Sequence, residues 1–171
     1  MNKIQEILVR YFLIIILSAG NLYLFYSLFS PITIYPVFFF LDIVFNAELF
    51  GHTILVENVP IILINACIAG SAYYLLLFLN LSTPGIKIIK RVGFILLSFL
   101  IFLLLNIIRI LILSVMAIKG NSHFYITHIL FWYLLSTIFV VLIWFFLVKF
   151  FKVKNVPFYS DLKTIYSIIK R

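Results

Sequence analysis

The hydrophobic and polar positions of this chain form long apolar runs separated by short polar or basic stretches. Four runs, at residues 11–29, 68–81, 92–118 and 125–151, are apolar enough for membrane helices, although the second is short. Turn residues end the second run, and a polar turn ends the third. We therefore expect an all-α integral membrane protein with about four transmembrane helices, the first serving as a retained signal anchor.

Three stretches outside these runs carry other patterns. Residues 30–50 are apolar but contain two prolines and three polar side chains, so we expect a re-entrant or interfacial segment. Residues 52–64 hold two β-branched runs around Glu57 and Asn58, which predicts a short outer β-hairpin-like stretch. Residues 156–171 place isoleucines at helical spacing among basic residues, which predicts a cytoplasmic amphipathic tail helix.

Composition narrows the class of protein. Hydrophobic residues make up 65% of the 171, charged residues 11%, and the mean hydropathy is +1.26, which excludes a water-soluble globule. We expect one membrane domain over residues 1–171. The net charge of +8 does not indicate nucleic acid, because the basic residues flank apolar runs instead of alternating with aromatic residues. One cysteine excludes an internal disulfide.

The basic residues predict the orientation in the membrane. If the runs cross as expected, only Lys119 falls on one side. The other side is then cytoplasmic and holds both termini, and residues 30–50 do not cross completely. The residues on that side are Lys3, Arg10, Lys87, Lys90, Arg91, Lys149, Lys152, Lys154, Lys163, Lys170 and Arg171.

Cys67, Arg109 and His128 are predicted to lie at one depth. Counting ~1.5 Å of helix rise per residue from the basic anchors places them roughly 30, 27 and 31 Å away, close to the ~30 Å of hydrocarbon. Three separate segments therefore bring these side chains to the outer, extracytoplasmic boundary.

Cys67 has two interpretations, one as a functional residue and one as a packing residue. A single cysteine in a membrane helix is usually a small buried hydrophobe. Here it is expected at a strand-to-helix junction among small residues, where a substrate could approach and free N–H groups favour the thiolate. Gly70 and Ser71, just beyond it, are candidate substrate-binding residues.

Arg109 interrupts an apolar run, where a guanidinium costs at least ~2.5 kcal/mol and is usually kept for function or pairing. Asn106 lies one turn earlier on the same face and could bind Arg109 or a substrate carbonyl. The alternatives are snorkelling to the headgroups or a structural ion pair with Asp42, Glu48 or Glu57.

His128 opens the last run, either as an interfacial residue or as a general base oriented by Tyr125 or Thr127. His123 could take the same role but is expected to be solvated in the turn. A zinc site is conceivable, but the spacing matches no familiar metal pattern, so we expect no metal and no cofactor. The ligands of such a zinc site would be His52, His123, His128 and Cys67.

The order of these motifs resembles the exosortase and archaeosortase family. The matching residues are the Ala-Cys-Ile-Ala-Gly segment around Cys67, the Asn-x-x-Arg pattern ending at Arg109, and His128, within residues 51–151. Ile68 departs from the small hydroxyl residue usual at that position. The resemblance implies a membrane cysteine transpeptidase with Cys67, Arg109 and His128 as its catalytic residues, in a core of about 51–151.

The resemblance also implies the partners. Substrates would be surface proteins whose C-terminal tail combines a short motif, a membrane helix and a basic cluster, and the acceptor would often be a lipid. Two rival hypotheses stay open: a non-catalytic membrane subunit in which Cys67 only packs, and a small transporter-like protein in which Arg109 binds an anion.

Overall fold

The computed structural model describes residues 3–18, 22–132 and 136–153, together with residues 157, 159, 161, 165 and 166. The protein is mostly helical (76%) and has a small three-stranded sheet. The helices are α1 (Lys3–Ser18), α2 (Tyr23–Phe45), α3 (Asn65–Ile68), α4 (Gly70–Leu81), α5 (Ile88–Ile118), α6 (Phe124–Leu130) and α7 (Ser136–Phe150), and the strands are β1 (Glu48–Phe50), β2 (Thr53–Val56) and β3 (Val59–Ile62).

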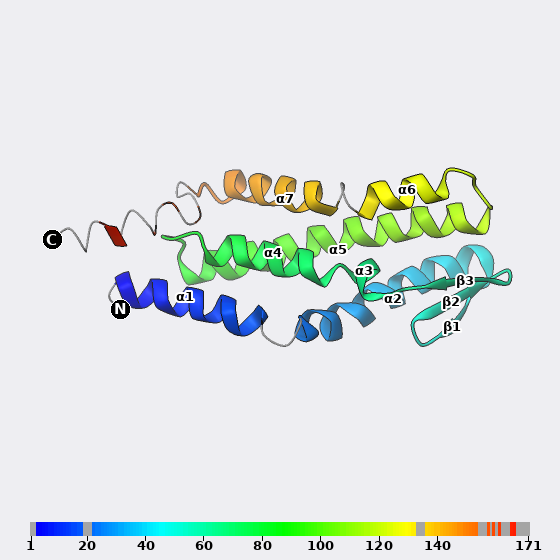
Figure 1. Cartoon of the computed structure of the whole chain (residues 1–171), viewed down its shortest axis with the longest axis horizontal. Helices are drawn as coiled ribbons and strands as arrows, with labels where there is room; N and C mark the ends of the chain where they lie inside the picture. The colour runs from blue at the N-terminus through cyan, green and yellow to red at the C-terminus, as the bar shows by residue number, and fades with distance from the viewer. Residues whose placement is uncertain are drawn as a thin grey trace.

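The helices lie along the long axis of the molecule (Figure 1). Helices α1 and α2 lead from the end that holds the N-terminus to the end that holds the sheet, and α4 returns. Helix α5 leads out again, and α6 and α7 return beside it. The turn after α4, the start of α5 and the end of α7 therefore meet at one end, which we call the basic end.

Two of the described helices, α2 and α5, are long and apolar enough to cross a membrane. The expected four transmembrane helices are not supported, because α1, α4 and α7 have 16, 12 and 15 residues, fewer than the ~20 that a crossing needs. Large apolar side chains on the outer faces of α2 and α5 are exposed, including Phe39, Ile43, Leu100 and Leu104. The two apolar helices thus indicate membrane association.

The N-terminal third differs from the expectation in how its apolar residues are divided. The run at 11–29 is not one helix, because α1 ends at Ser18 and Leu22 has a left-handed backbone (φ 60°) just before α2. Residues 30–50 were expected to be re-entrant or interfacial, but α2 continues through Pro31 and Pro36 as far as Phe45. Proline interrupts a helix less decisively where neighbouring helices pack against it.

The hairpin expected in residues 52–64 is present as β2 and β3, and β1 adds a strand that the pattern did not predict. Glu57 and Asn58 form its two-residue turn with φ of 48° and 67°. Both values are left-handed, as a type I′ turn requires. Ile54 and Val56 of β2 are fully buried, so one face of the sheet packs on the core.

Aromatic side chains join α2, α4 and α5. Tyr73 stacks on Phe29, with ring centroids 3.6 Å apart, and meets Phe102 edge to face at 4.9 Å. Gly70 lets α4 approach α2 closely, because a Cβ built at this position would lie 2.7 Å from Cε1 of Tyr26. This packing fixes the start of α4 against α2, next to the turn that carries Cys67.

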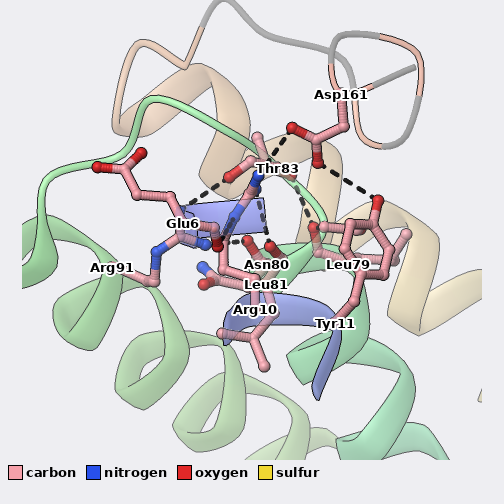
Figure 2. Close-up of polar contacts among 10 residues, drawn as sticks. Glu6, Arg10, Tyr11, Leu79, Asn80, Leu81, Thr83, Arg91 and Asp161 are labelled. Atoms are coloured by element: carbon pink, nitrogen blue, oxygen red, sulfur yellow. Dashed lines mark hydrogen bonds and ion pairs between the residues drawn. The ribbon is translucent and has the colours of Figure 1, made fainter. Parts of the chain in front are cut away.

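Two arginines close the basic end (Figure 2). Arg10 binds Asp161 (Nη2 to Oδ1, 2.7 Å) and donates to the carbonyl of Leu81 at 3.1 Å. Arg91 donates to the carbonyls of Asn80 and Thr83 at 2.6 and 2.9 Å. Both guanidiniums therefore cap the C-terminal end of α4, where positive charge is favourable.

The tail helix predicted for residues 156–171 lies mostly outside the described residues. Among those that are described, Asp161 is 3% exposed and joins the tail to α1 through Arg10.

Candidate functional site

One cavity of about 270 Å³ brings together the three side chains singled out from the sequence. It lies between the chain from β3 to α3 on one side and the helices α5 and α6 on the other, and Cys67, Arg109 and His128 all contribute to its wall. The remaining lining residues are Pro60, Ile61, Ile62, Leu63, Ile64, Ile110, Leu113, Ser114, Ala117 and Phe124.

Cys67 lies in the single turn of α3 and is partly exposed. The turn does not continue into α4, because Ala69 has a left-handed backbone (φ 57°, ψ 42°) and is the C-cap of α3. Its N–H donates to the carbonyl of Asn65 at 3.0 Å. Cys67 is thus not at the start of the long helix, as the sequence suggested, but in a separate turn before it.

Asn106 and Arg109 of α5 bind the carbonyl groups at the end of that turn. Nδ2 of Asn106 donates to the carbonyl of Cys67 at 2.9 Å and, more weakly, to that of Ile68 at 3.4 Å. Nη2 of Arg109 donates to the carbonyl of Ala66 at 3.5 Å. Because α3 stops at Ala69, these carbonyls lack helical partners, and the side chains of α5 replace them. Asn106, on α5, therefore holds the backbone of Cys67 in place through this hydrogen bond.

Arg109 is 5% exposed, although its guanidinium carries a full positive charge. It also lies close enough to Cys67 for the two groups to interact electrostatically. The three acids proposed as structural partners, Asp42, Glu48 and Glu57, are exposed, and none of them forms an ion pair within the described part of the chain. Arg109 is thus buried against the turn that carries Cys67, where it donates to the carbonyl of Ala66.

His128 lies on α6 and is half-buried. Its imidazole stacks on Phe124, with ring centroids 5.7 Å apart and planes 8° apart, and is tilted against Trp132 at 6.0 Å. Two aromatic rings thus hold the imidazole. Tyr125, suggested as its orienting partner, is 71% exposed.

The other predicted residues lie outside this cavity. Gly70 is buried against Tyr26, which gives it a packing role. Ser71 is exposed and lines a second cavity, of about 420 Å³, on the other side of α3. His123 is exposed, at the start of α6. Among the described residues, no group of three His, Cys, Asp or Glu side chains could hold a metal ion, so the zinc alternative gains no support.

Sequence reasoning missed part of the cavity wall. Ser114 is 3% exposed and lines the cavity from α5, on the same face as Ile110 and Ala117. Its polarity in an apolar run was a signal that could have found it. The wall formed by β3 carried no chemical signal, because its residues Pro60, Ile61 and Ile62 are apolar.

Comparisons with known protein families, with curated proteins and with solved structures found no match to this chain. The chemistry of the site must therefore be argued from its own groups. A thiol is a nucleophile, a buried guanidinium can stabilise an oxyanion, and an imidazole can carry a proton near neutral pH. A cavity that holds all three is suited to acyl transfer.

Proposed function

We propose that this protein is a membrane cysteine transpeptidase that cuts the C-terminal sorting signals of surface proteins and transfers the new C-terminus to an anchor, such as a lipid. The observation that carries the proposal is the shared cavity of Cys67, Arg109 and His128. These residues come from α3, α5 and α6, which are far apart in sequence, so their meeting is not a consequence of local structure.

The reaction would proceed in two acyl transfers. The Cys67 thiolate attacks the scissile carbonyl, and Arg109 stabilises the negative charge that develops on its oxygen. His128 gives a proton to the departing amine as the C–N bond breaks, which leaves a thioester on Cys67. His128 then removes a proton from the acceptor, whose attack on the thioester breaks the C–S bond and releases the thiolate, so that the thiolate and the protonated imidazole of the starting state are restored. Water as acceptor would give hydrolysis, and an amine or hydroxyl group would give transfer.

The free edge of β3 offers a place for the peptide. In a two-residue hairpin the pair next to the turn, Val56 and Val59, exchanges hydrogen bonds, and hydrogen-bonded pairs then alternate along the strands. The backbone groups of Pro60 and Ile62 therefore point away from β2, toward an edge that no described strand covers. Both residues line the cavity. An extended peptide added along this edge would lead toward Cys67.

The membrane would supply the remaining positioning. Helix α5 is a candidate span, and Arg109 lies 21 residues after its first residue, Ile88. A substrate whose own helix crosses the same bilayer would present its cleavage motif at a fixed depth. We place the active site at the extracytoplasmic face and both termini in the cytoplasm, as the distribution of basic residues predicts.

The decisive experiment is to trap the thioester. The full chain is co-expressed with a host surface protein that carries the motif, helix and basic cluster, and the membranes are treated with hydroxylamine, which cleaves thioesters. We expect wild-type protein to carry a covalently attached substrate fragment that hydroxylamine releases. Cys67→Ala should carry no such fragment. Ser71→Ala is the matched control, because Ser71 lines the other cavity, and should process normally. Cleaved substrate from Cys67→Ala membranes would falsify the mechanism.

The contacts of Asn106 and Arg109 with the α3 carbonyls favour one rival, a non-catalytic membrane subunit in which both side chains are only structural. In that case Cys67→Ala would insert normally and leave the host's surface proteins unchanged. The rate at which iodoacetamide alkylates the single cysteine gives a second, substrate-free comparison. An activated thiolate reacts faster than the same thiol in the Arg109→Gln protein.

A further inference from the structure

A third cavity, of about 280 Å³, lies at the basic end between the first turn of α5 and the end of α7. Three lysines line it: Lys87 and Lys90 from the start of α5, and Lys152 just after α7. No acidic residue is among its described lining residues. The cavity is therefore enclosed on several sides by positive charge without a described counter-charge.

These lysines differ from the arginines of the same end. Arg10 and Arg91 are engaged by Asp161 and by the carbonyls at the end of α4 (Figure 2). Within the described part of the chain, Lys87, Lys90 and Lys152 make no side-chain hydrogen bond and no ion pair, and all three are exposed. Their charge is thus available to an anion.

The backbone adds to the positive potential. The first turn of α5 contains no acidic residue, and its N-cap, Lys87, makes no side-chain capping bond. Cations at a helix N-terminus oppose the helix dipole, by about 0.3–1 kcal/mol each. A bound anion would relieve this repulsion as well as that between the lysines.

The rest of the wall is apolar and continues onto a lipid-like surface. Ile86, Phe151 and Val153 line the cavity beside the lysines. Ile88 and Ile89, next to it, are 80% and 87% exposed, at the point where the candidate span α5 begins. A ligand that fits both surfaces has an anionic phosphate attached to an apolar body.

We propose that this cavity binds the phosphate group of an anionic phospholipid, with Lys87, Lys90 and Lys152 as its ligands. The acyl chains would lie along the exposed isoleucines of α5. Basic pockets at the ends of membrane helices are suited to this role, since each nearby lysine adds about 1 kcal/mol of attraction to anionic lipid. The site is independent of the catalytic proposal, because it lies at the opposite end of α5 from Arg109.

The test uses the purified full chain in neutral detergent with three probes: dioctanoyl phosphatidylglycerol, dioctanoyl phosphatidylcholine and inorganic phosphate. Native mass spectrometry counts bound lipid, and the thermal unfolding midpoint reports stabilisation. We expect binding and a raised midpoint with phosphatidylglycerol alone. An equal effect of phosphatidylcholine, which carries a phosphate but no net charge, would overturn the assignment to an anionic lipid, and an equal effect of inorganic phosphate would overturn the assignment to a lipid.

Charge-matched variants separate this cavity from general attraction. Lys87→Gln/Lys152→Gln removes two cavity lysines, and Lys119→Gln/Lys149→Gln removes two exposed lysines that do not line it. At about fivefold for each lysine, the first pair should weaken phosphatidylglycerol binding on the order of 25-fold. The second pair should change it less than about twofold, a margin allowed for screened surface charge. Equal losses in both pairs would overturn the proposal.

Lys152→Gly keeps the test valid if the double variant folds poorly. Lys152 has a left-handed backbone (φ 53°), a conformation that favours glycine. The bonds of its own N–H to the carbonyl of Lys149 and of Val153 N–H to that of Val148 complete a Schellman motif. Glycine should therefore stabilise the lipid-free protein while weakening lipid binding about fivefold. Undiminished binding by Lys152→Gly and by the double variant would contradict the site.

Discussion

The two ends of α5 use arginine in the same way but in different surroundings. At the basic end, Arg91 caps the carbonyls of Asn80 and Thr83, and Arg10 caps that of Leu81 while it pairs with Asp161. At the other end, Arg109 caps the carbonyl of Ala66. Of these three arginines, Arg109 lines a cavity together with a cysteine and a histidine, whereas the cavity lined by Arg10 and Arg91 has neither among its described residues. A buried arginine that caps a short helix is thus not by itself a sign of function, and what it faces is the informative part.

The largest expected effect comes from breaking the ion pair of the basic end. Arg10→Met leaves the carboxylate of Asp161, which is 4% exposed, without its charged partner. A buried charge left in this way typically costs about 3–5 kcal/mol of folding free energy. Denaturation by sodium dodecyl sulfate in mixed micelles measures this loss. The compensated variant Arg10→Met/Asp161→Leu should recover most of it, and a loss below about 1 kcal/mol, the value of an exposed pair, would contradict the assignment.

Replacing Arg109 should affect activity more than stability. Arg109→Gln should lower substrate processing by about 10²–10³-fold, the usual effect of removing one oxyanion donor. The bond to Ala66 should contribute only about 1 kcal/mol to folding. Processing is measured by immunoblot of the substrate, and folding as for Arg10. Arg109→Lys should keep part of the activity because it keeps the charge. A large loss of stability with unchanged alkylation of Cys67 would instead make Arg109 purely structural.

Gly70→Ala tests whether the packing next to the site can be separated from its chemistry. The new methyl group would lie 2.7 Å from Cε1 of Tyr26, so the Tyr26 ring or the two helices must shift. Overpacking of this kind costs about 1–3 kcal/mol. Adding Tyr26→Leu should restore part of the stability. Since Gly70 does not line the Cys67 cavity, the alkylation rate of the single cysteine should not change, and a marked change would link the two regions.

The smallest expected effect is a gain in the hairpin. Glu57 and Asn58 both have left-handed backbones, and glutamate is poorly suited to this conformation. Glu57→Asn/Asn58→Gly supplies the preferred residues of a type I′ turn and should stabilise the protein by roughly 1 kcal/mol. Because β3 keeps its register, processing should be unchanged. A loss of stability would show that the turn has contacts beyond its own backbone.

The sequence predicted the hairpin, the long helix α5 and the convergence of three side chains better than it predicted the N-terminal third. Residues 52–64 hold two β-branched runs around a polar pair, and residues 92–118 are apolar except for Asn106 and Arg109. Arg109 was visible because a charge in an apolar run is costly. Residues 11–45 are apolar throughout, so hydropathy alone could not divide them, and the sequence signal for the boundary was the Gly-Asn pair before Leu22. Proline was given too much weight as a breaker within α2.

The local structure at Cys67 could not have been predicted. Residues 65–81 look like one helical segment, and nothing in the pattern marks Ala69 as left-handed, since alanine is the best helix former. Tertiary contacts determine the break: α5 supplies Asn106 and Arg109 to the carbonyls of α3. The packing of Gly70 could not have been predicted for the same reason, because its close contact is with Tyr26 in a helix far away in sequence.

The break at Ala69 has a mechanical consequence. The turn that carries the thiol is covalently continuous with α4 but is fastened to α5 through two side chains. Its position should therefore depend on α5 as well as on α4, and substitutions at Asn106 or Arg109 should change the surroundings of the thiol while the stacked rings of Phe29 and Tyr73 still join α2 and α4. The side chains that bond this turn therefore come from α5 and not from the residues that follow Cys67 in the sequence.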